Sequence, residues 1–188
     1  MVIAEIIKQY LQLGFTHVIP LGFDHILFIL SIFFLNSNLR SVIIQCSVFT
    51  VAHSISLGLS AADFMVVDTK IIEPLIALSI VVTAIENIVS EKVNKWRLLV
   101  IFLFGTIHGL GFASALKETG IDKSHFFLSL MCFNFGVEIG QVIVVLAAYY
   151  LISKWFSYKV WYKQRIVYPL SGLIGIIAIY WTIERIIS

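Results

Sequence analysis

Charged residues are scarce in this chain. Lys, Arg, Asp and Glu make up only 13% of the 188 residues, and the formal net charge of +2 is too small to indicate a nucleic-acid partner. Cysteine is scarcer still: Cys46 and Cys132 have no paired spacing, which excludes a disulfide framework and gives sulfur no evident part in metal binding. The sequence also lacks a nucleotide-binding loop. Any active transport would therefore draw on an ion gradient or the membrane potential.

Apolar residues dominate the sequence. They make up 60% of it, aromatic residues make up 14%, and the mean hydropathy is +0.98, well beyond the composition of soluble domains. Because roughly 20 apolar residues cross a bilayer as a helix, we predict an all-α polytopic membrane protein. It would be a six-transmembrane-helix bundle and a single integral membrane domain over residues 1–188. The predicted spans are about 16–36, 41–62, 71–90, 96–116, 124–152 and 166–187.

The first fifteen residues carry Glu5 and Lys8 in a short amphipathic pattern. They have no basic leader, no long apolar run and no small-residue cleavage site, so we do not expect a secretory signal. We expect a short N-terminal interfacial helix before the first span.

The distribution of basic residues predicts the orientation. Of the 13 Lys and Arg residues, eight lie in the loops between predicted spans 1 and 2, 3 and 4, and 5 and 6, and five lie on the opposite side. Because basic residues concentrate in cytoplasmic loops, these three loops should be cytoplasmic and both termini outside.

Ionisable side chains lie inside four of the apolar segments. Asp24 and His25 lie in the first segment, His53 in the second, His108 in the fourth and Glu138 in the fifth. At about 1.5 Å per residue, all five fall near mid-membrane, where such groups are costly and normally face a partner, a cavity or an ion. Three imidazoles and two carboxylates are suitable ligands for a divalent metal ion. We therefore predict a shared metal site formed by these five side chains.

Further polar residues extend this site into a predicted pathway. His17 shares a helix face with Asp24 and His25 and is either an interfacial residue or a metal ligand nearer the outside. Asn134 and Gln141 share a face with the carboxylate of the fifth span, and Glu86 falls deeper, toward the cytoplasm. Simpler explanations stay open for all of them. The histidines could be interhelical packing partners, the Asp-His pair an internal ion pair, and the mid-membrane Glu a protonated acid bonded to a backbone carbonyl.

Three segments carry a family resemblance. Residues 17–28, 104–113 and 133–141 read HVIPLGFDHILF, FGTIHGLGFA and FNFGVEIGQ. In this order they resemble the HupE/UreJ family of bacterial membrane proteins. The resemblance implies a six-span protein of the bacterial inner membrane. It also implies a secondary permease for nickel or cobalt that supplies hydrogenase and urease.

The resemblance carries metal binding over to Asp24, His25 and His108. The chain departs from the family's typical motifs at three places. It has one residue more between His17 and the Asp-His pair. In the fourth-span motif, Gly105 lies near the position of a second His, and Gly111 stands where the motif has a Glu.

The sequence favours one function and leaves a second open. The favoured function is secondary transport, most readily import, of a divalent transition-metal ion, with Ni²⁺, Co²⁺ or Zn²⁺ suited to histidine and carboxylate ligands. The alternative is an intramembrane zinc-dependent hydrolase acting on a lipid-like substrate, with Glu138 as general base. The metal ion and membrane lipid are the expected partners, nucleic acid is not, and a homo-oligomer is left open.

Overall fold

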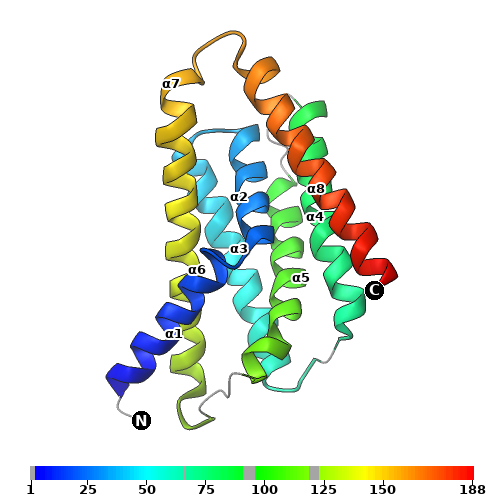
Figure 1. Ribbon diagram of the computed structural model, residues 1–188. Helices are drawn as coiled ribbons and strands as arrows, with labels where there is room; N and C mark the ends of the chain where they lie inside the picture. The colour runs from blue at the N-terminus through cyan, green and yellow to red at the C-terminus, as the bar shows by residue number, and fades with distance from the viewer. Residues whose placement is uncertain (1–2, 66, 91–95, 119–122) are drawn as a thin grey trace.

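The computed structural model describes residues 3–65, 67–90, 96–118 and 123–188. All regular elements in these ranges are helical, which confirms the predicted all-α class. Figure 1 shows them gathered in an elongated bundle, with α1 projecting at the N-terminal end. The elements are α1 (Ile3–Val18), α2 (Phe23–Leu35), α3 (Leu39–Ala61), α4 (Thr69–Val89), α5 (Arg97–Glu118), η1 (Lys123–His125), α6 (Phe126–Ala148), η2 (Tyr149–Ser153), α7 (Lys154–Phe156), η3 (Lys163–Val167) and α8 (Tyr168–Ile187).

The helices are those of a membrane protein. Four described segments are long and apolar enough to span a bilayer: Leu39–Ala61, Thr69–Val89, Phe126–Phe156 and Lys163–Ile187. α1 and α2 together make a fifth candidate, and α5 is apolar over the shorter segment Arg97–Ala113. The predicted count of six spans is therefore not confirmed, because length and composition support four or five.

The first predicted span is broken. α1 extends past residue 15, where the predicted interfacial helix ends, and α2 begins only after an interruption that turns the chain by 66°. Pro20 lies in the interruption and has no N–H to donate to a helix. A Cβ at Gly22 would lie 2.2 Å from the carbonyl oxygen of His17, so this turn requires glycine. The break places His17 and His25 on two different helices.

α1 packs against α6. A Cβ at Gly14 would lie 1.9 Å from the carbonyl oxygen of Phe133, and a Cβ at Gly136 would lie 2.2 Å from that of Leu11. Small residues permit this approach of two helix backbones. α1 is therefore packed against the bundle through α6.

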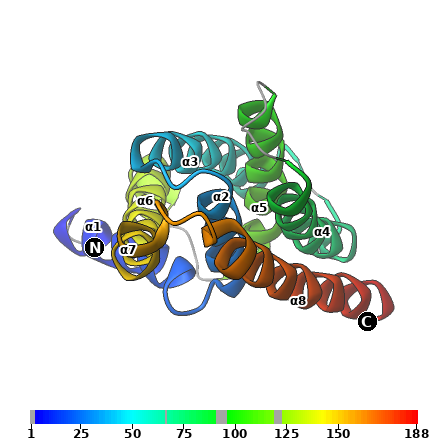
Figure 2. The same cartoon turned by 90° about the horizontal axis from the view of Figure 1, so that it is seen from above.

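α2 lies at the centre of the bundle. Seen from above, the other membrane helices surround it (Figure 2), and it contacts α3, α4, α6 and α8. The most extensive contacts join α3 with α5, α1 with α6 and α4 with α8. α3 and α5 approach closely at Gly109, where a Cβ would lie 2.1 Å from Ser56 Oγ and 2.3 Å from the carbonyl oxygen of His53. This contact brings the His53 and His108 regions together.

Candidate metal centre

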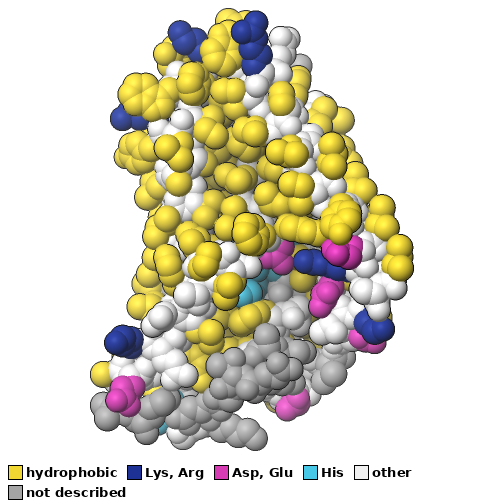
Figure 3. Space-filling model, in the orientation of Figure 1, with side chains coloured by type: hydrophobic (Ala, Val, Ile, Leu, Met, Phe, Trp, Pro, Cys, Tyr) yellow, Lys and Arg dark blue, Asp and Glu magenta, His cyan; other side chains and the backbone are white. Residues whose placement is uncertain are grey.

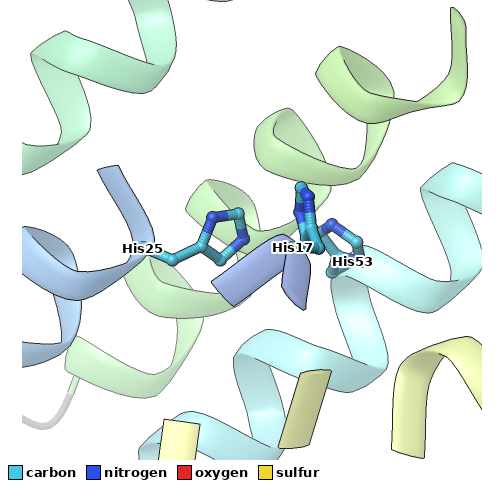
Figure 4. A group of neighbouring side chains, drawn as sticks. All are labelled: His17, His25 and His53. Carbon is cyan, nitrogen blue, oxygen red and sulfur yellow. The ribbon is translucent and has the colours of Figure 1, made fainter. Parts of the chain in front are cut away.

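Three imidazole rings from three helices meet beside the break between α1 and α2. His17 lies in the last turn of α1, His25 in the first turn of α2 and His53 in the second half of α3. Each ring offers one nitrogen, and these nitrogens all lie within 4.8 Å of one another. Figure 4 shows the three side chains directed toward one another. His25 and His53 are buried and His17 is half-buried. The structure thus brings His17 into the same group as two of the predicted ligands.

Asn134 determines which nitrogen of His53 faces the group. The Nδ1 of His53 lies 3.4 Å from the Oδ1 of Asn134. The amide of Asn134 donates to the carbonyl oxygen of Leu130 at 2.8 Å, so its oxygen is the atom turned toward the ring. A carbonyl oxygen only accepts hydrogen bonds, so Nδ1 carries the proton and Nε2 keeps its lone pair.

Asp24 does the same for His25. Its Oδ1 accepts from the Nδ1 of His25 at 3.2 Å and from the backbone N–H of His25 at 2.8 Å. An ionised carboxylate accepts only, so the Nε2 of His25 is again the nitrogen with a free lone pair. A carboxylate behind a histidine in this way is the common arrangement around metal-binding imidazoles. The geometry therefore gives Asp24 the place of a residue that orients His25.

His108 adjoins the group and is oriented by Ser79. The ring centroids of His108 and His25 are 5.1 Å apart. The hydroxyl of Ser79 donates its one proton to the carbonyl oxygen of Ile76 at 2.7 Å, so it can only accept from the Nε2 of His108 at 3.2 Å. This leaves the lone pair of His108 on Nδ1. Sequence reasoning missed Ser79, because a single Ser in an apolar helix is common and gives no signal of its own.

The remaining ring nitrogens are unpartnered. Within the described ranges, the Nε2 atoms of His17, His25 and His53 and the Nδ1 atom of His108 are buried and have no hydrogen-bond partner. An unmade hydrogen bond at a buried polar atom costs roughly 1–3 kcal/mol, and four such atoms on neighbouring rings are exceptional. Interhelical hydrogen bonds explain one nitrogen each of His53 and His108, and Asp24 of the same helix explains one nitrogen of His25. The other nitrogen of each ring is left unexplained. A metal ion would satisfy these lone pairs.

A polar cavity adjoins the histidines. It has a volume of about 220 Å³, and its lining includes His17, Asp24, His25 and His108 together with Glu73 and Arg185. Glu73 lies near the start of α4 and Arg185 in the last turn of α8. Figure 3 shows histidine at the bottom of a hollow in this face, with acidic and basic side chains beside it.

The comparisons with known proteins identify the family. The family described as HupE / UreJ protein matches residues 2–185, nearly the whole chain. This chain belongs to the HupE/UreJ family. No curated protein and no solved structure matches it. The match confirms the resemblance that the three sequence segments indicate.

In this HupE/UreJ chain Glu138 lies apart from the histidine group. Its carboxylate accepts from Ser47 Oγ at 2.7 Å and from Thr50 Oγ1 at 2.5 Å, both on α3. Gln141 lies beside them, with its Oε1 3.3 Å from Thr50 Oγ1. Among the described residues, the group of converging ligand atoms contains His17, His25 and His53 and does not include Glu138. The depth of Glu138 predicts that it shares the site, but it is not part of this group. It lies about one helical turn from Asn134 on α6.

Glu86 takes part in an ion pair at the other end of the HupE/UreJ bundle. Its carboxylate accepts from Arg97, a buried residue of α5. Arg97 also donates from Nε to Gln45 Oε1 at 2.6 Å and from Nη2 to the carbonyl oxygen of Ile32 at 3.4 Å. The guanidinium thus joins α2, α3, α4 and α5.

Sequence reasoning counted Arg97 among the loop charges of predicted spans 3 and 4. Its partner Glu86 lies 11 residues before it, across the loop, and such a spacing is a weak sequence signal for an ion pair. The other basic residues of that loop, Lys92 and Lys95, lie outside the described residues.

Proposed function

We propose that this protein is a secondary transporter of a divalent transition-metal ion of the nickel or cobalt type. The HupE/UreJ family is associated with nickel and cobalt transport. The observation that carries the proposal is the group formed by His17, His25 and His53. These rings offer nitrogens within 4.8 Å of one another, and each ring has a buried Nε2 without a hydrogen-bond partner. The metal ion is the substrate here, and the imidazoles hold it in transit.

The donor set favours a transition metal over a hard cation. Neutral imidazole nitrogens suit Ni²⁺, Co²⁺ and Zn²⁺, whereas Mg²⁺ and Ca²⁺ prefer oxygen ligands. His108 would be a fourth nitrogen donor, since its lone pair also lies on a buried atom beside His25. A spacing of up to 4.8 Å is wide for nitrogens that share an ion at about 2.0–2.1 Å. The rings would close on the ion by small side-chain rotations.

The pathway runs from the cavity to the histidines and on toward Arg97. In the predicted orientation the cavity beside Glu73 and Arg185 opens to the outside, as an importer of the inner membrane requires. The ion would pass Asp24 to reach the imidazoles. At the cytoplasmic end the Arg97–Glu86 pair closes the bundle, so release would require this pair to separate.

The hydrolase alternative finds no support in the cavities. An apolar cleft of about 490 Å³ lies between α2, α6 and α8, open to a lipid chain. Among the described residues that line it, none is a histidine or a carboxylate. A lipid held there would meet no side chain of the kind that binds zinc or activates water. We therefore propose transport alone.

The test is metal stoichiometry and uptake of the purified protein. His25→Ala and His53→Ala should each weaken Ni²⁺ binding by more than the roughly 10–100-fold that loss of an outer partner costs. Both should also abolish Ni²⁺ uptake into proteoliposomes under an imposed proton gradient. His125→Ala is the matched control, because His125 lies at the start of α6 and outside the group. Metal content by plasma mass spectrometry that stays at the parent value in both variants would contradict the proposal.

A further inference from the structure

A second polar cluster lies between α3 and α6, and it consists of oxygen donors and acceptors. We call it the Glu138 cluster; it comprises Glu138, Ser47, Thr50 and Gln141. Both carboxylate oxygens of Glu138 are engaged, Oε1 by Ser47 at 2.7 Å and Oε2 by Thr50 at 2.5 Å. The cluster is separate from the histidines, whose donors are nitrogens.

The hydroxyl of Thr50 has more acceptors than protons. It lies within hydrogen-bond distance of three oxygens: the carbonyl oxygen of Cys46 at 3.1 Å, Glu138 Oε2 at 2.5 Å and Gln141 Oε1 at 3.3 Å. A hydroxyl donates one hydrogen and accepts others. When Glu138 is ionised, Thr50 has to donate to it and leaves Cys46 and Gln141 without this donor. When Glu138 carries a proton on Oε2, the carboxylic acid donates a hydrogen bond to the Thr50 oxygen. The Thr50 hydroxyl is then free to donate to the carbonyl oxygen of Cys46.

The cluster therefore has the hydrogen-bonding capacity for one additional proton. It does not accommodate a metal ion in the same way. Two oxygens that share an ion at about 2.3–2.6 Å each, as around Ca²⁺, lie farther apart than the 2.5 Å between Thr50 and Glu138. The proton is the ligand that fits this spacing.

The other titratable groups on the helices packed against α6 are distinct from this site. On α3, the thiol of Cys46 has an electrostatic interaction with Glu138, His53 belongs to the candidate metal centre, and Arg40 is exposed in the first turn. On α2, Asp24 and His25 belong to the candidate metal centre. The titratable groups on α1 are His17 of the metal centre, the buried Tyr10 and the exposed Glu5 and Lys8.

The Glu138 cluster and His53 share the contact between α3 and α6. Thr50 and His53 are three residues apart on α3, and Glu138 and Asn134 are four apart on α6, so each pair lies on one helix face. The Thr50–Glu138 and His53–Asn134 hydrogen bonds are consequently neighbouring contacts between the same two helices, about one helical turn apart. A displacement of α6 along α3 changes both together.

We propose that Glu138 is the proton-binding site of this protein, distinct from the metal centre and coupled to it through the α3–α6 contact. The inference rests on the proposed metal transport. Loss of the proton from Glu138 to water draws the Thr50 hydroxyl onto the carboxylate, and return of the proton releases it. This exchange shifts the contact that holds Asn134 against His53. The proton gradient can thereby drive the metal ion without any group being shared between the two sites.

The experiment compares the parent protein with Glu138→Gln, which keeps the shape of the side chain and one of its two accepting oxygens but cannot ionise. The variant should bind Ni²⁺ with affinity near the parent's and should still exchange Ni²⁺ across proteoliposomes. Its uptake should no longer respond to an imposed pH gradient. Reciprocal coupling also requires metal affinity to depend on the proton site. In the parent, protonation of Glu138 should change the Ni²⁺ affinity by roughly 5–150-fold. This part of the pH dependence should be absent from Glu138→Gln.

Infrared difference spectroscopy provides a readout that does not depend on transport. Adding Ni²⁺ to the parent should change a carboxylic-acid carbonyl band that is absent from Glu138→Gln. If the parent moves no metal, the proposed function fails, and this band together with the pH dependence of binding still decides the proton site. Thr50→Val is the second variant, for use if Glu138→Gln does not fold; it should also uncouple uptake from the pH gradient. Gradient-driven uptake equal to the parent's in the folded variant, or complete loss of Ni²⁺ binding in Glu138→Gln, would overturn the proposal.

Discussion

The Nδ1 of His53 and the Oδ1 of Asn134 lie 3.4 Å apart, and this contact leaves the buried Nε2 of His53 as the nitrogen with a free lone pair. Asn134→Ala removes the acceptor and allows the ring to rotate or change tautomer. We expect Ni²⁺ affinity to fall by about 10–100-fold, measured by titration of the purified protein. Asn134→Asp keeps an acceptor oxygen at the same place, so its Ni²⁺ affinity should equal that of the parent protein. Equal affinity for Asn134→Ala and the parent would refute the orienting role.

Asp24 should behave as an orienting residue for His25. Asp24→Asn retains an oxygen that can accept from His25 Nδ1, whereas Asp24→Ala does not. We therefore expect Asp24→Ala to lose about 10–100-fold in Ni²⁺ affinity and Asp24→Asn to lose clearly less, by calorimetric titration. If both variants lost the same amount of Ni²⁺ affinity, and more than about 100-fold, Asp24 would instead be a direct metal ligand.

Ser79 should matter to metal binding only through His108. Ser79→Ala removes the acceptor that fixes the lone pair of His108 on Nδ1. We expect a loss of Ni²⁺ affinity of up to about 10-fold, at the lower end of outer-partner effects. Thr83→Val is the matched control, because the Thr83 hydroxyl donates to backbone oxygens one turn further along α4. The same affinity in both variants would remove His108 from the ligand set.

Gly109 should be intolerant of a methyl group. A Cβ there would lie 2.1 Å from Ser56 Oγ and 2.3 Å from a backbone oxygen of α3. Gly109→Ala should therefore destabilise the protein by about 1–3 kcal/mol, seen as a lower unfolding temperature in detergent. At Gly172 no described atom lies within 4 Å of the added carbon, so Gly172→Ala should be neutral or stabilising by up to about 1 kcal/mol. Equal effects at the two positions would contradict the close α3–α5 contact.

Arg97 should stabilise the bundle through its partners. Arg97→Ala leaves the Glu86 carboxylate and Gln45 without their donor, and breaking a buried pair costs about 3–5 kcal/mol. Adding Glu86→Ala should restore part of the loss, because the uncompensated charge is then gone. A double-mutant cycle in reversible unfolding measures the coupling. Additive effects of the two substitutions would mean that the pair does not stabilise the fold.

The sequence by itself determined the class of protein and the set of polar residues that matter. Hydrocarbon penalises every charged or imidazole side chain, so Asp24, His25, His53, His108 and Glu138 are conspicuous within their apolar segments. The order of the three segments also determined the family, which the match over residues 2–185 confirms. The common site of His25, His53 and His108 stays a prediction from their depth along the helices. In the structure the ring centroid of His25 lies 5.9 Å from that of His53 and 5.1 Å from that of His108.

Only the tertiary structure decided which of these residues form one site. His17 joins the group because the chain turns by 66° after α1, and the angle of a break depends on how both helices pack. Asn134 and Glu138 lie on the same face of α6, and either could have met His53. An offset of one turn, about 5.4 Å, between α3 and α6 decides between them. That offset is set by contacts such as Ser47 and Thr50 against Glu138, which join residues far apart in the chain. Periodicity along a single helix contains no information about such an offset.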